Sequence, residues 1–304
     1  MGQRLRSWLA TGIPIRFNKV AGTLEEDADG RVTVHFKDGT TATGDLVVGA
    51  DGVSSAVRQH LVQPDPVHVL PIATVVGEVT LSGRDFERQL ELGYSGYVAS
   101  DAGSKGDGRG GMFVGLNSVS SDGKSGSYYW SMTYFDPAAS NLPHWTSSAT
   151  KEERYKLALE KTNHHLPDFT EIIRKTGPEG ISDSPLCFRE LEIQSLPVGR
   201  VTLLGDAAHC MTPFRGEGGV QAMRDALKLA RIITKIANSD VNEEEIKQLM
   251  AEYQDEMLQR GGNAVRLSRE EWTKVSDGTR AGWGTRGSTL PKQEVSLSRI
   301  PFAE

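Results

Sequence analysis

One stretch, residues 201–237, constrains the fold of this chain more than any other. It begins with four strand-forming residues, and the acidic turn Gly205-Asp206 follows directly. A loop with one proline and three glycines comes next, and the segment after these glycines contains neither residue type. This order predicts a strand, a loop and a helix. Its chemistry suits a phosphorylated, hydroxyl-rich ligand, because an ionised Asp accepts hydrogen bonds from hydroxyl groups and the N–H groups at a helix start attract electron-rich atoms.

A second stretch, DLVVGADGVSSAVR, also has an acidic turn after a strand. Residues 45–50 are apolar after the first Asp and predict a buried strand. Asp51-Gly52 then turns the chain, and either Ser54 or Ser55 is expected to cap a helix. The turn therefore lies at the carboxyl end of a parallel strand, which is where open α/β folds place their ligands.

Together the two stretches resemble the flavin-binding motifs of the group A flavoprotein monooxygenases, the p-hydroxybenzoate hydroxylase-like family. The run GDAAHCMTPFRGEGG, with Asp225-Ala226 after it, resembles the family's second flavin-binding motif. The Asp-Gly motif is represented by Asp51-Gly52. The motifs stand in the family's order with room for its middle domain between them, and the resemblance covers roughly residues 1 to 276.

The resemblance implies FAD as the cofactor and NAD(P)H as co-substrate. In the family the aspartate of the Gly-Asp turn contacts the ribityl or pyrophosphate part of FAD, the glycine loop lies along the isoalloxazine ring, and the following helix points at the C2 carbonyl of that ring. The Asp-Gly motif is associated with both the FAD pyrophosphate and NADPH, and an Arg often follows it. The implied cofactor-binding residues are Asp51, Gly52, Arg58, Gly205, Asp206, Pro213, Gly216, Glu217, Gly218 and Gly219.

The implied reaction is the insertion of one oxygen atom from O2 into a small organic substrate, aromatic or polycyclic, after NAD(P)H has reduced the flavin. The motifs themselves imply no general base, and the catalytic residues stay unknown. In the family, a sheet comparable to the one predicted around residues 127–135 forms a wall of the substrate pocket. Tyr128 and Trp130 share one face of this strand and are therefore pocket candidates, although ordinary core packing is the competing interpretation for each.

The chain departs from the family before Asp51, where no G-x-G-x-x-G turn follows a strand. The only formal match, at Gly106, Gly108 and Gly111, follows a polar loop and precedes a strand, so we read it as a flexible loop. The expected fold is therefore an α/β FAD/NAD(P)-binding domain, truncated at its N-terminus, with an inserted antiparallel sheet. A different function stays open, that of a relative without tight FAD binding, either a non-redox small-molecule binder or enzyme or an inactive fragment.

Four segments are expected. Residues 1–66 form a partial FAD-binding domain, which includes a strand over 15–24. Residues 67–190 form the inserted domain, whose strands follow one another without intervening helices and precede a helix with a capping box at Thr150 and Glu153. Residues 191–237 return to the FAD-binding domain. Residues 238–304 form C-terminal helices, interrupted at Gly261-Gly262, and a loose tail from residue 277 onward.

Composition limits the partners. A formal net charge of −6 argues against a nucleic-acid partner, and no apolar run is long enough for a transmembrane segment. The absence of a signal-like leader and the presence of only two cysteines favour a cytoplasmic protein. His209 lies three residues after Asp206, but no third ligand is nearby, so no metal is expected. Without the family's first strand–helix–strand unit, the strand over residues 45–50 would have one unpaired edge, and this exposed edge makes a homodimer possible.

Overall fold

The computed structural model describes residues 2–99, 110–183 and 185–276 and divides the chain into two compact units. The split lobe comprises Gly12–His68 and Arg189–Thr273, and the middle lobe is built mainly of Val69–Phe188. The chain passes between them close to β5 (His68–Val69) and β10 (Arg189–Glu190). The domain boundaries that the sequence predicts lie at residues 66 and 190, and these boundaries stay a prediction. The two units of the structure meet along the chain after His68 and after Phe188.

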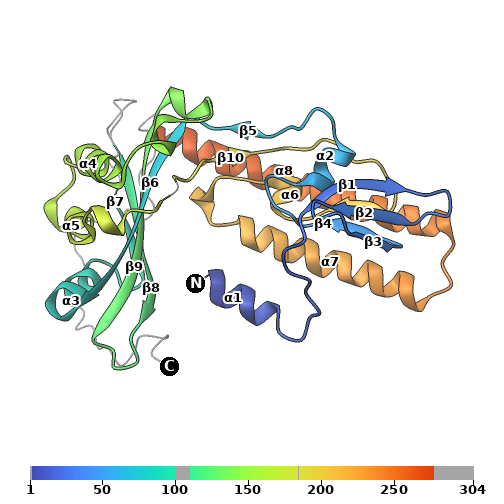
Figure 1. Ribbon diagram of the computed structural model, residues 1–304, viewed down its shortest axis with the longest axis horizontal. Coiled ribbons are helices and arrows are strands. Elements are labelled where there is room, and N and C mark those ends of the chain that lie inside the picture. The colour runs from blue at the N-terminus through green and yellow to red at the C-terminus, as the bar shows by residue number, and fades with distance from the viewer. Residues whose placement is uncertain (1, 100–109, 184, 277–304) are drawn as a thin grey trace. The chain divides into compact units, whose positions relative to one another are not determined.

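The split lobe contains the parallel strand pair on which both sequence motifs depend. Strand β4 (Val47–Gly49) lies beside β11 (Val201–Leu203), with Gly49 opposite Leu203. Because the paired strands end at the same level, the turns that follow them emerge at one edge of the sheet. The helices that follow these turns are α2 (Ala56–Leu61), α6 (Asp206–His209), α7 (Gly218–Asn238) and α8 (Glu243–Ser276). Figure 1 labels one strand of the pair, β4, near the helices α2, α6 and α7.

A separate three-stranded antiparallel sheet of the split lobe precedes β4. It consists of β1 (Ala21–Glu26), β2 (Val32–Phe36) and β3 (Thr41–Gly44), paired in that order. The predicted strand over 15–24 is wrong in its first half. Residues 15–18 and Val20 are exposed, and Asn18 has a φ of 60°, so ladder pairing begins only at Ala21.

The middle lobe is a four-stranded antiparallel sheet with helices packed against it. Its strands lie in the order β6 (Ile72–Ser82), β9 (Ser125–Phe135), β8 (Gly111–Val119) and β7 (Gly96–Ala99). The main helices are α4 (Lys151–Lys161) and α5 (Pro167–Thr176), and short 3-10 turns occur at Pro137–Ser140, Trp145–Ser147 and Pro178–Gly180. The capping box between Thr150 and Glu153 is confirmed.

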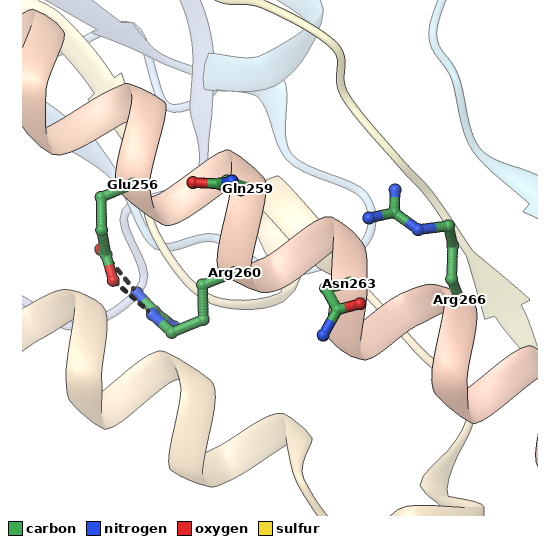
Figure 2. A pocket seen from close by; sticks show the side chains of 5 residues that line it. All are labelled: Glu256, Gln259, Arg260, Asn263 and Arg266. Atoms are coloured by element: carbon green, nitrogen blue, oxygen red, sulfur yellow. Dashed lines mark hydrogen bonds and ion pairs between the residues drawn. The ribbon is translucent and has the colours of Figure 1, made fainter.

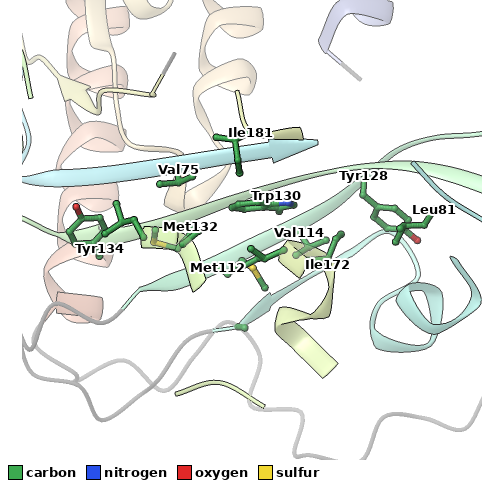
Figure 3. Packing of buried hydrophobic residues seen from close by; sticks show 14 of the residues in the cluster. Val75, Leu81, Met112, Val114, Tyr128, Trp130, Met132, Tyr134, Ile172 and Ile181 are labelled. Carbon is green, nitrogen blue, oxygen red and sulfur yellow. The ribbon is translucent and has the colours of Figure 1, made fainter. Parts of the chain in front are cut away.

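Alternation along β9 decides which side chains form the core of the middle lobe (Figure 3). Tyr128 and Trp130 are buried in one hydrophobic cluster with residues such as Met112 and Ile172, whereas Tyr129, between them, is 38% exposed. The Trp130 indole N–H donates to Thr176 Oγ1 at 2.8 Å, which satisfies its polar atom inside the core.

Two expectations about helices are wrong. The middle segment does contain a helix between strands, α3 (Gly83–Leu92), whose Phe86, Gln89 and Leu90 are buried at helical spacing. Helix α8 runs through Gly261-Gly262 without interruption. The glycine match at residues 106 and 108 and the tail from residue 277 lie outside the described residues. None of the helices in the described ranges has the length and apolar character that a membrane span requires.

Candidate cofactor site

Asp51 shapes the first turn by capping the helix that follows it. Its carboxylate accepts hydrogen bonds from the Ser55 hydroxyl and, at 2.8 Å, from the Ala56 amide. The Ser55 hydroxyl in turn accepts from the amide of Arg58 at 2.9 Å, so Ser55 is the cap residue of α2. Gly52 has a φ of 76°, and a side chain there would meet no atom within 4 Å, so the turn presents bare backbone to the outside.

Arg58 connects the two motifs from inside the lobe. Its guanidinium is fully buried and donates to the carbonyls of Val53, at 2.6 Å, and Ala207, at 3.1 Å. Its Nε donates to Asp65 Oδ1 at 3.0 Å. Burial alone would raise the pKa of Asp65, but the hydrogen bonds from Arg58 and Gln59 outweigh this effect and lower it. Arg58 thus holds the two turns together with donors already engaged within the protein.

Asp206 presents its carboxylate at the surface. It is the first residue of α6 and follows Gly205, whose φ of 62° and ψ of −142° suit glycine alone. Asp206 is exposed, and its carboxylate accepts no hydrogen bond from any residue in the described part of the chain. A Cβ placed on Gly218 would lie 4.0 Å from Asp206 Oδ1, so this carboxylate lies next to the start of α7.

The glycine loop leaves the start of α7 open. Pro213 is exposed in a 3-10 turn over Pro213–Arg215, and Gly216 adopts the left-handed conformation with a φ of 67°. Glu217 occupies the cap position, but its side chain does not cap the helix, because it accepts from Arg215 at 2.6 Å. Side chains at Gly216 and Gly219 would meet nothing within 4 Å.

The amide groups of Gly218 and Gly219, at the start of α7, have no acceptor among the described residues. An exposed carboxylate, uncapped helix amides and a bare glycine backbone converge here. The carboxylate can accept from the hydroxyls of a ribityl chain, the amides can donate to a ring carbonyl, and the glycines leave room for a planar ring. The residues present fit FAD.

His209 faces a different carboxylate from the one that its position in the sequence suggests. Its Nε2 lies 2.7 Å from Asp225 Oδ2, and both side chains are buried. Asp225 and Arg260, which pairs with it at 2.7 Å, were not among the predicted site residues. The sequence did signal Asp225, because Asp225-Ala226 ends the second motif and places an acidic residue inside an otherwise apolar and basic helix. Within the described ranges, no group of three or more His, Cys, Asp or Glu side chains could hold a metal ion.

A polar pocket of about 370 Å³ lies along α8 and is lined by Glu256, Gln259, Arg260, Asn263 and Arg266 (Figure 2). Its arginines are engaged with the protein. Arg260 Nε donates to Glu256 at 2.8 Å, and Arg266 donates to Glu192. Each arginine of the pocket is thus already paired with a carboxylate, in contrast to the exposed and uncapped start of α7.

Neither pocket candidate of the middle lobe lines an open surface, since Tyr128 and Trp130 are 1% and 0% exposed. The other face of the sheet exposes aromatic and aliphatic side chains beside polar ones such as Glu78. Phe113 and Tyr129 lie there with ring centroids 5.6 Å apart, and Val98 and Phe135 are also exposed.

Comparison with known proteins agrees with the predicted fold class. A family described as FAD binding domain matches residues 4–268. FAD-dependent monooxygenase thnD of Trichoderma harzianum is 43% identical over 98% of this chain and 73% of its own length. FAD-dependent urate hydroxylase of Klebsiella pneumoniae is 31% identical over 72% of this chain and 50% of its own length.

Two solved structures resemble the chain in fold. Klebsiella pneumoniae HpxO complexed with FAD and uric acid has a TM-score of 0.65 and 24% identity, covering 89% of this chain and 61% of that protein. The 2,6-dihydroxypyridine-3-hydroxylase of Arthrobacter nicotinovorans has a TM-score of 0.69 and 19% identity, covering 93% of this chain and 70% of that protein. The predicted α/β FAD-binding fold with an antiparallel sheet is confirmed.

Proposed function

We propose, from the premise that this chain belongs to the FAD binding domain family of flavin-dependent monooxygenases, that it oxygenates a small planar ring compound with NAD(P)H as reductant. Its character as an FAD-dependent oxidoreductase follows from the family. The reductant and the substrate class are our inference. The observation that carries the proposal is the exposed Asp206 carboxylate beside the uncapped start of α7.

Bound FAD would supply the reduction of O2 and the transfer of one oxygen atom. The contribution of the chain is binding and electrostatics. Asp206 would accept hydrogen bonds from the hydroxyl-bearing part of the cofactor, and the amides of Gly218 and Gly219 would donate to an electron-rich edge of its ring. Asp51 and Arg58 act indirectly, because one caps α2 and the other clamps the two turns together.

The substrate surface we propose is the open face of the middle-lobe sheet, in place of the buried pair Tyr128 and Trp130. Phe113 and Tyr129 are 40% and 38% exposed there, and their tilted rings can stack on or edge against a planar substrate. Relatives named as hydroxylases of urate and of 2,6-dihydroxypyridine support a planar ring as the substrate class.

The first test is the visible absorption spectrum of the purified chain before and after incubation with FAD and desalting. We expect a flavin band that stays with the protein. Asp206→Asn should weaken FAD binding by at least about tenfold, because a hydrogen bond to a charged acceptor contributes roughly 1.5–3 kcal/mol. Asp240→Asn is the matched control, since Asp240 is exposed beyond the end of α7 and should bind FAD as the wild type does.

A colourless protein that takes up no added FAD would refute the proposed function for this chain and would favour a non-redox role. Equal FAD affinity of the Asp206→Asn and wild-type proteins would remove Asp206 from the site. If FAD is retained, NADPH consumption with candidate ring compounds tests the reductant and the substrate class. Phe113→Ala should then raise KM, with FAD affinity unchanged.

A further inference from the structure

The buried carboxylate of Asp225 holds the Gly205-Asp206 turn from inside the lobe, whereas the carboxylate of Asp206 is exposed. The amide of Gly205 donates to Oδ2 of Asp225 at 2.8 Å. His209 Nε2 lies 2.7 Å from the same oxygen. Asp225 is a residue of α7 and is 0% exposed. One helix therefore carries both the open amides at its start and the side chain that fixes the turn before them.

Helix α8 completes the environment of this carboxylate. Arg260 Nη2 donates to Asp225 Oδ1 at 2.7 Å, and its Nη1 donates to Gln221 Oε1 at 2.6 Å. Burial alone would raise the pKa of Asp225, but the hydrogen bonds from His209, Arg260 and the Gly205 amide outweigh this effect and lower it. Both oxygens of an ionised carboxylate are thus used, by donors from three elements.

His209 is held in place by packing as well as by its hydrogen bond. Its side chain is 1% exposed, and a Cβ added to Gly261 of α8 would lie 2.4 Å from His209 Cδ2. Because an ionised carboxylate can only accept, His209 Nε2 must donate the proton. The imidazole is therefore oriented by Asp225 on one side and by the bare backbone of Gly261 on the other.

We propose that Asp225 and His209 are positioning residues that hold the Gly-Asp turn in the conformation that receives FAD. The inference rests on the proposed function and adds residues to its site. Gly205 adopts a conformation that other residues rarely reach, and its buried amide needs an acceptor, because an unsatisfied buried donor costs about 1–3 kcal/mol. Without that acceptor the turn relaxes, and the Asp206 carboxylate loses its fixed position beside Gly218.

Asn is an informative replacement for Asp225. Its single carbonyl oxygen can face either Gly205 and His209 or Arg260, and in both orientations its amide group opposes a donor. We expect Asp225→Asn to bind FAD more than about tenfold more weakly than the wild type. His209→Leu should also weaken FAD binding, because leucine cannot donate to Asp225. His209→Gln should retain most of the affinity of the wild type, because the Nε2 group of glutamine can donate to Asp225.

A stability control separates positioning from general loss of structure. The Tyr253 hydroxyl donates to the carbonyl of Leu203 at 2.8 Å, which is a buried bond from α8 to the strand just before the turn. Tyr253→Phe removes this bond without touching Gly205, Asp206 or Asp225. We expect it to lower the unfolding midpoint while the folded protein binds FAD within about twofold of wild type.

Amide hydrogen exchange of the protein without FAD provides a readout independent of the cofactor. Peptides covering residues 203–210 should lose protection in the Asp225→Asn and His209→Leu proteins but keep it in the Tyr253→Phe protein. If Asp225→Asn does not fold, the comparison of His209→Leu with His209→Gln decides the question in the same way.

The outcomes separate this inference from the proposed function. A wild-type chain that takes up no FAD overturns the proposed function and the cofactor part of this inference, and the exchange data then decide whether Asp225 fixes the turn. Wild-type-like protection and FAD affinity in the Asp225→Asn and His209→Leu proteins would overturn the positioning role. So would equal losses of affinity in the Tyr253→Phe and Asp225→Asn proteins.

Discussion

At the scale of single residues, Arg58 shows how a motif position can act without touching a ligand. The resemblance implied a cofactor contact, whereas the side chain is buried and bonded to Val53, Ala207 and Asp65. A buried guanidinium is stable only with partners for its charge and its donors. Asp65 supplies that charge from a side chain that is 30% exposed.

We predict that Asp65→Asn destabilises the protein by about 2 to 3 kcal/mol at pH 7, because it leaves a buried charge without its carboxylate. The pKa of Asp65 is lowered in the folded state. Its contribution is therefore present above the ordinary carboxyl pKa of about 3.9 and is lost as the pH falls through the folded-state pKa. Urea unfolding at several pH values measures the difference between wild type and variant.

The difference should shrink below about pH 4. Asp45→Asn is the control, since the Asp45 side chain is 85% exposed and its distant ion pair with Arg31 should contribute less than about 1 kcal/mol. A wild-type-like stability of the Asp65→Asn protein at pH 7 would show that Arg58 does not depend on Asp65.

At the scale of elements, helix α8 shows why two adjacent glycines need not end a helix. Gly261 is where the imidazole of His209 packs against the helix, and any side chain there would collide with it. Gly262 has no such neighbour, since the nearest atom to an added Cβ is Glu192 Oε1 at 3.4 Å. Packing by the surrounding elements offsets the low helix propensity of both glycines.

We predict opposite effects of alanine at these two positions. Gly262→Ala should stabilise the protein by up to about 1 kcal/mol, because alanine is the better helix former. Gly261→Ala should destabilise it by about 1 to 3 kcal/mol despite the same gain in propensity, because the methyl group displaces His209. Chemical denaturation of the two variants measures both signs. Equal stabilisation by both substitutions would contradict the packing of His209 on α8.

At the scale of the whole molecule, large apolar side chains are exposed in several places. Trp8 and Phe17 near the N-terminus are 71% and 75% exposed, and Leu227 on α7 is 64% exposed. The same face of α7 also exposes Val220 and Met223. Apolar surface of this extent is typical of regions that another chain covers, or of proteins that aggregate.

We therefore predict that the chain self-associates at micromolar concentration. Light scattering coupled to size exclusion should give a mass above that of one chain, and a hydrophobic-surface dye should bind to whatever monomer remains. Leu227→Arg should reduce both signals, whereas Lys228→Arg, its neighbour on α7, should not. A clean monomer that binds no dye would contradict this prediction.

The sequence by itself determined the features that depend on neighbours along the chain. The strand, turn, glycine loop and helix of residues 201–237, the Asp-Gly turn, the alternation of Tyr128 to Trp130 and the capping box at Thr150 were all readable, because the residues that make each feature lie within a few positions of one another.

Only the tertiary structure decided which groups hold these features in place. Arg58 reaches Ala207, Asp225 accepts from Gly205, and His209 packs on Gly261, and each of these pairs is distant in sequence. The burial of Tyr128 and Trp130, the helix α3 and the continuity of α8 were decided in the same way. The physical reason is that burial and hydrogen-bond partners depend on which surfaces meet in the folded chain, and a local pattern of residues does not contain that information.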